Sequence, residues 1–128
     1  MNDRADRGKR QMSAANRGAQ VRIKVRVGED AVGPGKIRLL ELVDSEGGIS
    51  AAGRQMGLSY RRAWHLINTL NTALGEPVIE TSVGGEGGGG AQLTDTGRAL
   101  VERYREAFAA AEAAMKPFTE WLDDPGGE

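Results

Sequence analysis

The stretch that decides the fold runs from Ile49 to Leu66 and reads Ile-Ser-Ala-Ala-Gly-Arg-Gln-Met-Gly-Leu-Ser-Tyr-Arg-Arg-Ala-Trp-His-Leu. Its apolar residues recur at the spacing of two short helices, and Gly57 stands between them, where a left-handed backbone is cheap only for glycine. Gly53 stands where the helices would approach most closely. This pattern predicts a helix-turn-helix, two helices that cross steeply through a short turn, although any packed helical hairpin could imitate part of it.

One more helix is predicted upstream of this stretch, so the chain has three in order and the second helix of the helix-turn-helix is the third. It begins at about Pro34 and ends at Gly47-Gly48, because proline suits the first helical position and glycine suits a C-terminal cap. We expect Ser50 and Ser59 to cap the two helices of the helix-turn-helix, and Gly75 to end the second of them.

The remaining segments predict two strand regions and a last helix. Residues 21–27 alternate apolar and basic side chains, which predicts one strand before a turn region over 28–35. Residues 77–80 and 91–93 predict a hairpin, and Thr94 or Thr96 is expected to cap a helix that runs to about Leu122. A three-helix core with a hairpin after the third helix is the winged-helix order, so the expected fold is mainly α with a small β component, a winged helix-turn-helix with a long C-terminal dimerisation helix.

This interpretation divides the chain into four parts. We expect a disordered basic arm over 1–19, the winged helix-turn-helix DNA-binding domain over 20–95, the long dimerisation helix over 96–122 and an acidic tail over 123–128. The formal net charge is only −1, but basic residues gather in the first 36 positions and acidic ones near the end. Such polarity is typical of a protein with one DNA-facing side, and chance clustering on a solvated surface is the alternative.

Composition excludes several function classes. The chain has no cysteine and one histidine, so disulfides, thiolate metal sites and multi-histidine metal sites within one chain are excluded. No apolar run approaches the roughly 20 residues of a membrane span, and the first residues lack the apolar core of a secretory signal. We therefore expect a cytoplasmic protein without cofactor, metal or membrane partner. An enzyme has almost no support, because no nucleophile has a base placed near it in a motif.

The outward face of the predicted third helix points to double-stranded DNA. Its exposed N-terminal half carries arginines and no acid, which suits a polyanion, and arginine side chains read base edges or hold phosphates. An ordinary solvated face would usually include glutamate or aspartate. The candidate DNA-binding residues are Ser59, Tyr60, Arg61, Arg62 and His65, with Arg54 and Lys36 as phosphate contacts. Trp64 is expected to pack against the hairpin.

The glycine-rich loop between the last two strands is interpreted as a wing. It lacks the Gly-Lys-Ser/Thr sequence of a phosphate loop and leads into a strand, not a helix. Glycine amides can approach a DNA phosphate closely, which makes Gly84, Gly85, Gly87 and Gly88 the candidate wing residues. A plain hairpin tip is nearly as good an explanation, and Glu86 would sit badly beside DNA.

The last helix carries an apolar stripe longer than a small domain can cover. Pairing with a second copy would bury it, and folding back across its own domain is the alternative. Pro117 should bend this helix. The candidate dimerisation residues are Leu100, Tyr104, Phe108, Ala111, Met115 and Phe118.

Five motifs in order carry a family resemblance: Gly33-Pro34-Gly35-Lys36, Gly47 to Ala52, Leu58 to Trp64, Gly84 to Ala91, and Leu93-Thr94 with Gly97. Together they resemble the N-terminal DNA-binding domain of the ModE molybdate-responsive regulators, and more distantly LysR-type helix-turn-helix domains. The resemblance covers most of the chain, from about Val21 to Phe118.

The resemblance implies a homodimeric transcriptional regulator whose third helix enters the major groove, with Ser59, Tyr60, Arg61 and Arg62 where the family contacts DNA. It also implies a possible link to molybdenum metabolism. ModE proteins continue into small β-barrel domains that bind molybdate, whereas this sequence stops at Glu128. Molybdate is therefore not expected to bind this chain by the family's route. The alternative function is a protein-interaction module derived from a winged helix that no longer binds DNA.

Overall fold

The computed structural model describes residues 18–83 and 90–127. The chain divides into two compact units, which we describe separately. Of the described residues, one unit holds those between Arg22 and Phe108, and the other combines 18–21 with 109–127. The larger unit contains the helix-turn-helix.

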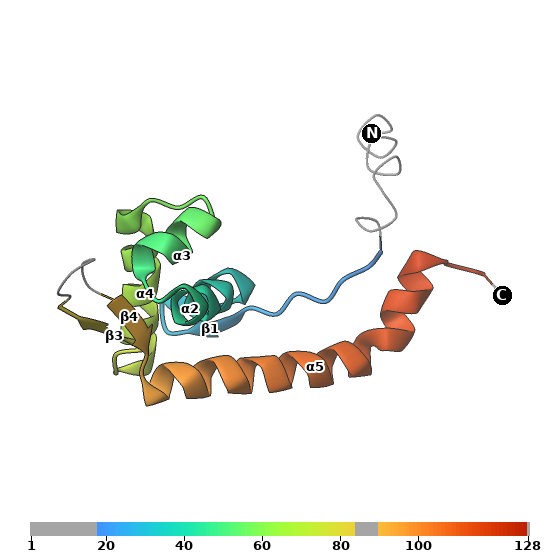
Figure 1. Ribbon diagram of the computed structural model, residues 1–128. Helices are drawn as coiled ribbons and strands as arrows, with labels where there is room; N and C mark the ends of the chain where they lie inside the picture. The colour runs from blue at the N-terminus through green and yellow to red at the C-terminus, as the bar shows by residue number, and fades with distance from the viewer. Residues whose placement is uncertain (1–17, 84–89, 128) are drawn as a thin grey trace. The chain divides into compact units, whose positions relative to one another are not determined.

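Three helices form the centre of the larger unit: α2 (Pro34–Glu46), α3 (Ile49–Gln55) and α4 (Tyr60–Leu74) (Figure 1). As predicted, Pro34 opens α2 and Gly47, with φ +79°, closes it. Helices α3 and α4 contact each other across the turn at Gly57, where φ is +71°. A Cβ built on the buried Gly53 would lie 3.2 Å from the Leu58 carbonyl oxygen, so this position needs a very small side chain, as predicted.

The start of α3 differs from the prediction. Gly48 occupies the N-cap position and no side chain caps the helix, so Ser50 lies inside the helix and is not its cap. The buried Ile49 is the first helical residue, and its packing into the core starts the helix before Ser50 can serve as the cap. The prediction for α4 is confirmed, because Ser59 Oγ accepts a hydrogen bond from the Arg62 amide at 3.0 Å and Gly75 ends the helix.

The N-terminal strand region is a hairpin, not a single strand. Strand β1 covers only Val25–Val27 and pairs antiparallel with β2 (Asp30–Val32), which lies in the region predicted as a turn. Strand β2 packs against α4. The second hairpin, the predicted wing, joins β3 (Ile79–Ser82) to β4 (Gly90–Leu93).

Helix α5 (Asp95–Asp123) follows the second hairpin. Thr94 caps it as predicted, because its Oγ1 accepts a hydrogen bond from the Gly97 amide at 3.0 Å. The helix remains continuous through Pro117. In the smaller unit the amide of Ala19 donates to Asp123 Oδ1 at 2.7 Å.

The core of the larger unit is entirely apolar among the residues that the structure describes. Side chains from all three central helices fill it, and the second hairpin adds Val78, Ile79 and Leu93. The fully buried large side chains are Ile37, Leu39, Leu40, Val43, Ile67, Leu70 and Val78. Of the helices described, none is long and apolar enough to cross a membrane.

Candidate nucleic-acid interface

The first turns of α4 present the predicted recognition residues to solvent. The helix is amphipathic: Ala63, Ile67 and Leu70 are buried, and the opposite side is open. Ser59, Arg61, Arg62 and His65 are exposed and together line one shallow hollow on the surface. The structure therefore brings four of the predicted residues to one place.

The charged side chains on this face are all basic. Helix α4 contains no acidic residue, and its N-terminus adds unpaired amides and the positive end of the helix dipole. Among the described residues neither Arg61 nor Arg62 forms an ion pair, in contrast to Arg98, Arg105 and Lys116, each of which pairs with a carboxylate. The guanidinium groups of α4 are thus available to an anionic partner.

Tyr60 and Trp64 connect this face to the second hairpin. Tyr60 is about half exposed, and its hydroxyl oxygen accepts a hydrogen bond from Trp64 Nε1 at 2.7 Å. Both side chains line a groove whose other wall includes Thr81 and Ser82 at the end of β3. Trp64 is partly buried against the core beside the hairpin, where it was expected.

The two predicted phosphate contacts outside α4 have different environments. Arg54 is exposed in the last turn of α3. Lys36 is partly buried, and its Nζ donates a hydrogen bond to the Ala31 carbonyl at 2.8 Å. Burial lowers the pKa of Lys36, nearby Asp30 raises it, and Lys24 and Arg62 lower it further. Lys36 therefore fastens β2 to the start of α2, with its remaining ammonium donors still free to meet a phosphate.

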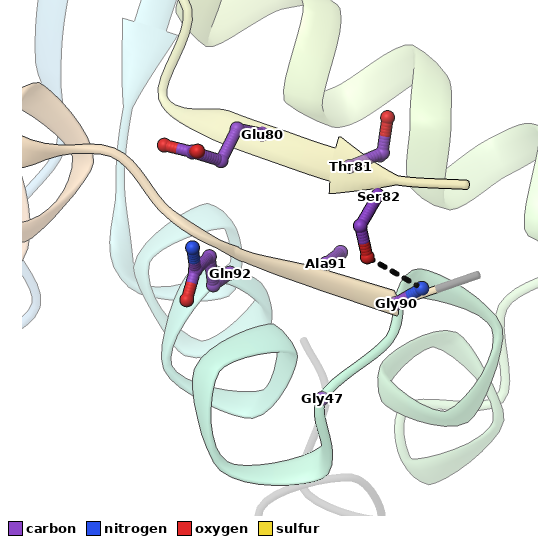
Figure 2. Close-up of a pocket in the computed structure, with 7 residues that line it drawn as sticks. All are labelled: Gly47, Glu80, Thr81, Ser82, Gly90, Ala91 and Gln92. Atoms are coloured by element: carbon purple, nitrogen blue, oxygen red, sulfur yellow. Dashed lines mark hydrogen bonds between the residues drawn. The ribbon is translucent and has the colours of Figure 1, made fainter. Parts of the chain in front are cut away.

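The predicted wing residues Gly84, Gly85, Gly87 and Gly88 lie outside the described residues, whereas the base of the wing lies within them. Figure 2 shows Ser82 Oγ accepting a hydrogen bond from the Gly90 amide, at 3.3 Å. The next amide, Ala91, donates to the carbonyl of Gly47 at 2.9 Å, beside the end of α2. The hairpin is therefore anchored to the helix that packs behind the helix-turn-helix.

Sequence reasoning missed the hydroxyl groups around this groove. Ser50, Thr81 and Ser82 line it together with Tyr60 and Trp64. The sequence did contain a signal for these hydroxyl groups, because β3 ends in two adjacent hydroxyl residues shortly before the glycine-rich loop. Hydroxyls are common phosphate ligands in protein–DNA complexes.

The predicted dimerisation stripe is divided between two environments. Tyr104 is buried in its own unit, donates its hydroxyl to the Ile23 carbonyl at 2.8 Å and stacks on Phe108. Leu100 and Phe108 are partly buried against the same core. Further along the helix Ala111 is half-buried, whereas Met115 and Phe118 are 40% and 51% exposed. The first part of the stripe thus packs on its own domain, the alternative considered above, because Tyr104 finds a partner in the segment before β1.

Fold and site together define this chain as a winged helix-turn-helix domain. Residues 35–98 match the model of the bacterial regulatory helix-turn-helix proteins of the lysR family, and the chain belongs to that family. The same part of the molecule contains the helix-turn-helix and the second hairpin.

The chain is homologous to ModE proteins, which confirms the resemblance seen in its motifs. It is 40% identical over 92 residues to the molybdenum transport protein ModE of Azotobacter vinelandii, covering 72% of this chain and 34% of that protein. The chain is 36% identical over 91 residues to the DNA-binding transcriptional dual regulator ModE of Escherichia coli, covering 71% of this chain and 34% of that protein. The chain is 43% identical over 79 residues to the molybdenum-pterin-binding protein MopA of Rhodobacter capsulatus, covering 62% of this chain and 30% of that protein. The chain thus spans about a third of the length of these relatives.

A solved structure supports the fold. The crystal structure of a CbnR_DBD-DNA complex superposes with a TM-score of 0.50 at 20% identity, covering 65% of this chain and 90% of that one. At this identity the likeness concerns the fold, and it confirms the winged-helix prediction.

Proposed function

We propose that this chain is a transcriptional regulator that binds double-stranded DNA as a homodimer, with α4 as the helix that enters the major groove. The observation that carries the proposal is the first half of α4, where Arg61, Arg62 and His65 are exposed together on a helix without acidic residues. A helix of a helix-turn-helix offers its N-terminal residues to base edges in this way.

The proposal assigns separate roles to the residues of the interface. Arg61 and Arg62 contact base edges or phosphates, and Tyr60 lies at the groove between α4 and the wing. Ser59, His65 and Arg54 are placed for polar or phosphate contacts, with Lys36 as a partly buried cation behind them. The glycines of the wing would let its backbone approach a neighbouring phosphate.

The relatives support the regulatory part of the proposal. One of them is described as a DNA-binding transcriptional dual regulator, and others take their names from molybdenum transport or molybdenum-pterin binding. We therefore connect the regulated genes to molybdenum metabolism and place the protein in the cytoplasm, with the DNA. No enzymatic activity is proposed, and no group of three or more potential metal ligands occurs in the part of the chain that the structure describes.

A DNA titration tests the proposal. Fluorescence anisotropy of short random duplexes, over a range of salt concentrations, should show tight and salt-sensitive binding by the wild-type chain. If a dimer neutralises about six phosphates, a plot of log K against the logarithm of the salt concentration should have a slope near −5. We expect Arg61→Ala with Arg62→Ala to weaken binding at least about tenfold and to make this slope shallower.

The matched control removes the same charge elsewhere. Arg38 and Arg103 are exposed on α2 and α5. Arg38 lies close enough to Glu41 to lower its pKa, and Glu41 pairs with Arg105 of α5. Arg38→Ala with Arg103→Ala should leave affinity and slope almost unchanged. Absence of duplex binding by the folded wild-type chain at low salt would refute the proposal.

A protein-interaction module is the second candidate. It is favoured by the exposed apolar side chains near the end of α5, which include Phe118, Trp121 and Leu122. Surface patches of this kind commonly bind another protein. The same titration separates the two candidates, because a module of this kind would be unaffected by loss of Arg61 and Arg62 and would show no salt-sensitive DNA binding.

A further inference from the structure

The β1–β2 hairpin is held rigidly beside the recognition helix. Strand β2 packs against α4, and Lys36 Nζ at the start of α2 donates to the Ala31 carbonyl of β2 at 2.8 Å. The segment just before β1 is fixed from the other side by the Tyr104 hydroxyl, which donates to the Ile23 carbonyl at 2.8 Å. A hairpin fixed at both places can present its side chains at a constant position relative to α4.

The outward side of β1 is basic. Lys24 and Arg26 are both exposed, and as residues two apart in an extended segment they face the same side. Arg26 stands opposite Ala31 in the strand register, so its cross-strand neighbour is a small side chain that leaves the guanidinium uncovered.

These cations continue the positive charge of α4. Lys36 lies between the two elements, and both Lys24 and Arg62 act electrostatically on it. In the described portion of the chain, neither Lys24 nor Arg26 forms an ion pair, as is also true of Arg62. A surface rich in cations therefore extends from α4, past the start of α2, to β1, with Asp30 as the carboxylate that acts on Lys36.

The acidic residues of the hairpin limit where contact can occur. Glu29 lies at its turn and Asp30 is the first residue of β2, and both line a hollow with Lys24 and Arg26. Asp30 pairs with Val27 in the register, so its side chain belongs to the opposite face from that of Arg26. The strand, and not the tip of the hairpin, is the part that suits an anionic partner.

We propose that the β1–β2 hairpin is a second wing, in which Lys24 and Arg26 bind the DNA phosphate backbone beside the groove occupied by α4. This inference rests on the proposed function. Phosphate contacts of this kind fix the register of a protein on the duplex without reading its sequence.

The test compares two variants with equal loss of charge in the full chain. Lys24→Gln with Arg26→Gln removes the proposed contacts, and Arg38→Gln with Arg103→Gln is the control. The probes are random duplexes and a duplex selected from a random pool by the wild-type chain. Binding of the hairpin variant should be about tenfold weaker, with a salt slope shallower by about 1.8 per bound protomer, since each lost phosphate contact removes about 0.9.

Hydroxyl-radical footprinting gives a second, positional measurement. The hairpin variant should lose backbone protection only at positions flanking those protected by α4, and its preference for the selected duplex over a scrambled one should stay unchanged. Circular dichroism melts that match the wild type would show that both variants are folded.

The outcomes separate this proposal from the one on which it depends. Suppose the wild type binds, Arg61→Ala with Arg62→Ala weakens that binding as expected, and the hairpin variant matches its control in slope and footprint. The second wing is then refuted and the proposed function stands. If the folded wild type does not bind any duplex, both fail.

Discussion

Gly97 lies in the first turn of α5, where the backbone of the helix closely approaches another segment. It is buried, and a Cβ built on it would overlap the carbonyl oxygen of Val78, which already accepts a hydrogen bond from the Thr94 amide at 3.0 Å. The backbone of Val78 cannot move away without disturbing this hydrogen bond. We expect Gly97→Ala to lower the free energy of unfolding by about 1–3 kcal/mol, measured by urea denaturation.

Gly35 provides the control for Gly97, since it also lies in the first turn of a helix. Nothing lies within 4 Å of a Cβ built on it. Gly35→Ala should be neutral, or stabilising by up to about 1 kcal/mol, because alanine has the higher helix propensity. An equal loss of stability in both variants would contradict the packing explanation.

Single residues show what local chemistry can and cannot predict. Ser59 and Gly75 were predicted at the ends of α4 because capping depends on the residue and its immediate neighbours. Ser50 has the same capping chemistry but lies inside α3, because burial of Ile49 decides where that helix begins. Likewise, nothing local indicated that the ammonium of Lys36 would be held by the Ala31 carbonyl, since that bond depends on a hairpin absent from the prediction.

At the scale of elements, the helices were predictable and the first hairpin was not. The apolar stripes of α2 and α4 repeat over several turns, which gives a strong periodic signal. Strand β2 has only three residues, Asp30–Val32, too few for alternation to be recognised. Its pairing with β1 is supported by packing against α4, a long-range contact that the local sequence does not contain.

A bidentate ion pair joins α2 to α5. Arg105 donates to both carboxylate oxygens of Glu41, from Nε at 2.8 Å and from Nη2 at 2.7 Å. The hydrogen bond from Arg105 lowers the pKa of Glu41, against the opposing effect of burial. A carboxyl with a lowered folded-state pKa stabilises the fold above its ordinary pKa, 4.5 for this group, and loses that contribution as the pH falls through the folded value.

We therefore expect Glu41→Gln to reduce the free energy of unfolding at neutral pH and to have little effect in acid. The side chains of Arg105 and Glu41 are 44% and 28% exposed, so solvent screens the pair and the loss should be only about 0.5–1 kcal/mol. Urea melts across the acidic and neutral range measure this difference. Glu102→Gln, at an exposed position of α5, should show no comparable pH dependence; a constant difference at all pH values would contradict the assignment to ionised Glu41.

At the scale of the whole molecule, the apolar stripe of α5 shows why periodicity alone cannot identify a partner. The spacing predicted that Tyr104 and Phe118 lie on one face of the helix, but Tyr104 is buried in its own unit and Phe118 is 51% exposed. Period 3.6 predicts which side of a helix is apolar, and the neighbouring elements decide which part of that side is already covered. The residues left for a second copy are therefore those near the end of α5.

The proposed dimer predicts a specific link between self-association and DNA binding. Met115 and Phe118 are the exposed apolar members of the stripe, and we expect Met115→Ser with Phe118→Ser to produce a monomer. Interface anchors commonly contribute about 2 kcal/mol or more, so losing two per protomer should weaken self-association at least about a thousandfold. Analytical ultracentrifugation over a range of concentrations measures this change.

DNA affinity then separates dimerisation from other roles of this surface. A dimer contacts two half-sites about 34 Å apart, so the variant should lose most of its affinity for a selected palindromic duplex while binding a half-site duplex like the wild type. Ala109→Ser with Ala113→Ser, on the opposite side of the same helix, should remain dimeric and bind both duplexes normally. If the Met115 and Phe118 variant keeps the mass of a dimer, the dimer is held by another surface. If the wild type is itself a monomer that binds half-sites, the exposed end of α5 belongs to a different partner.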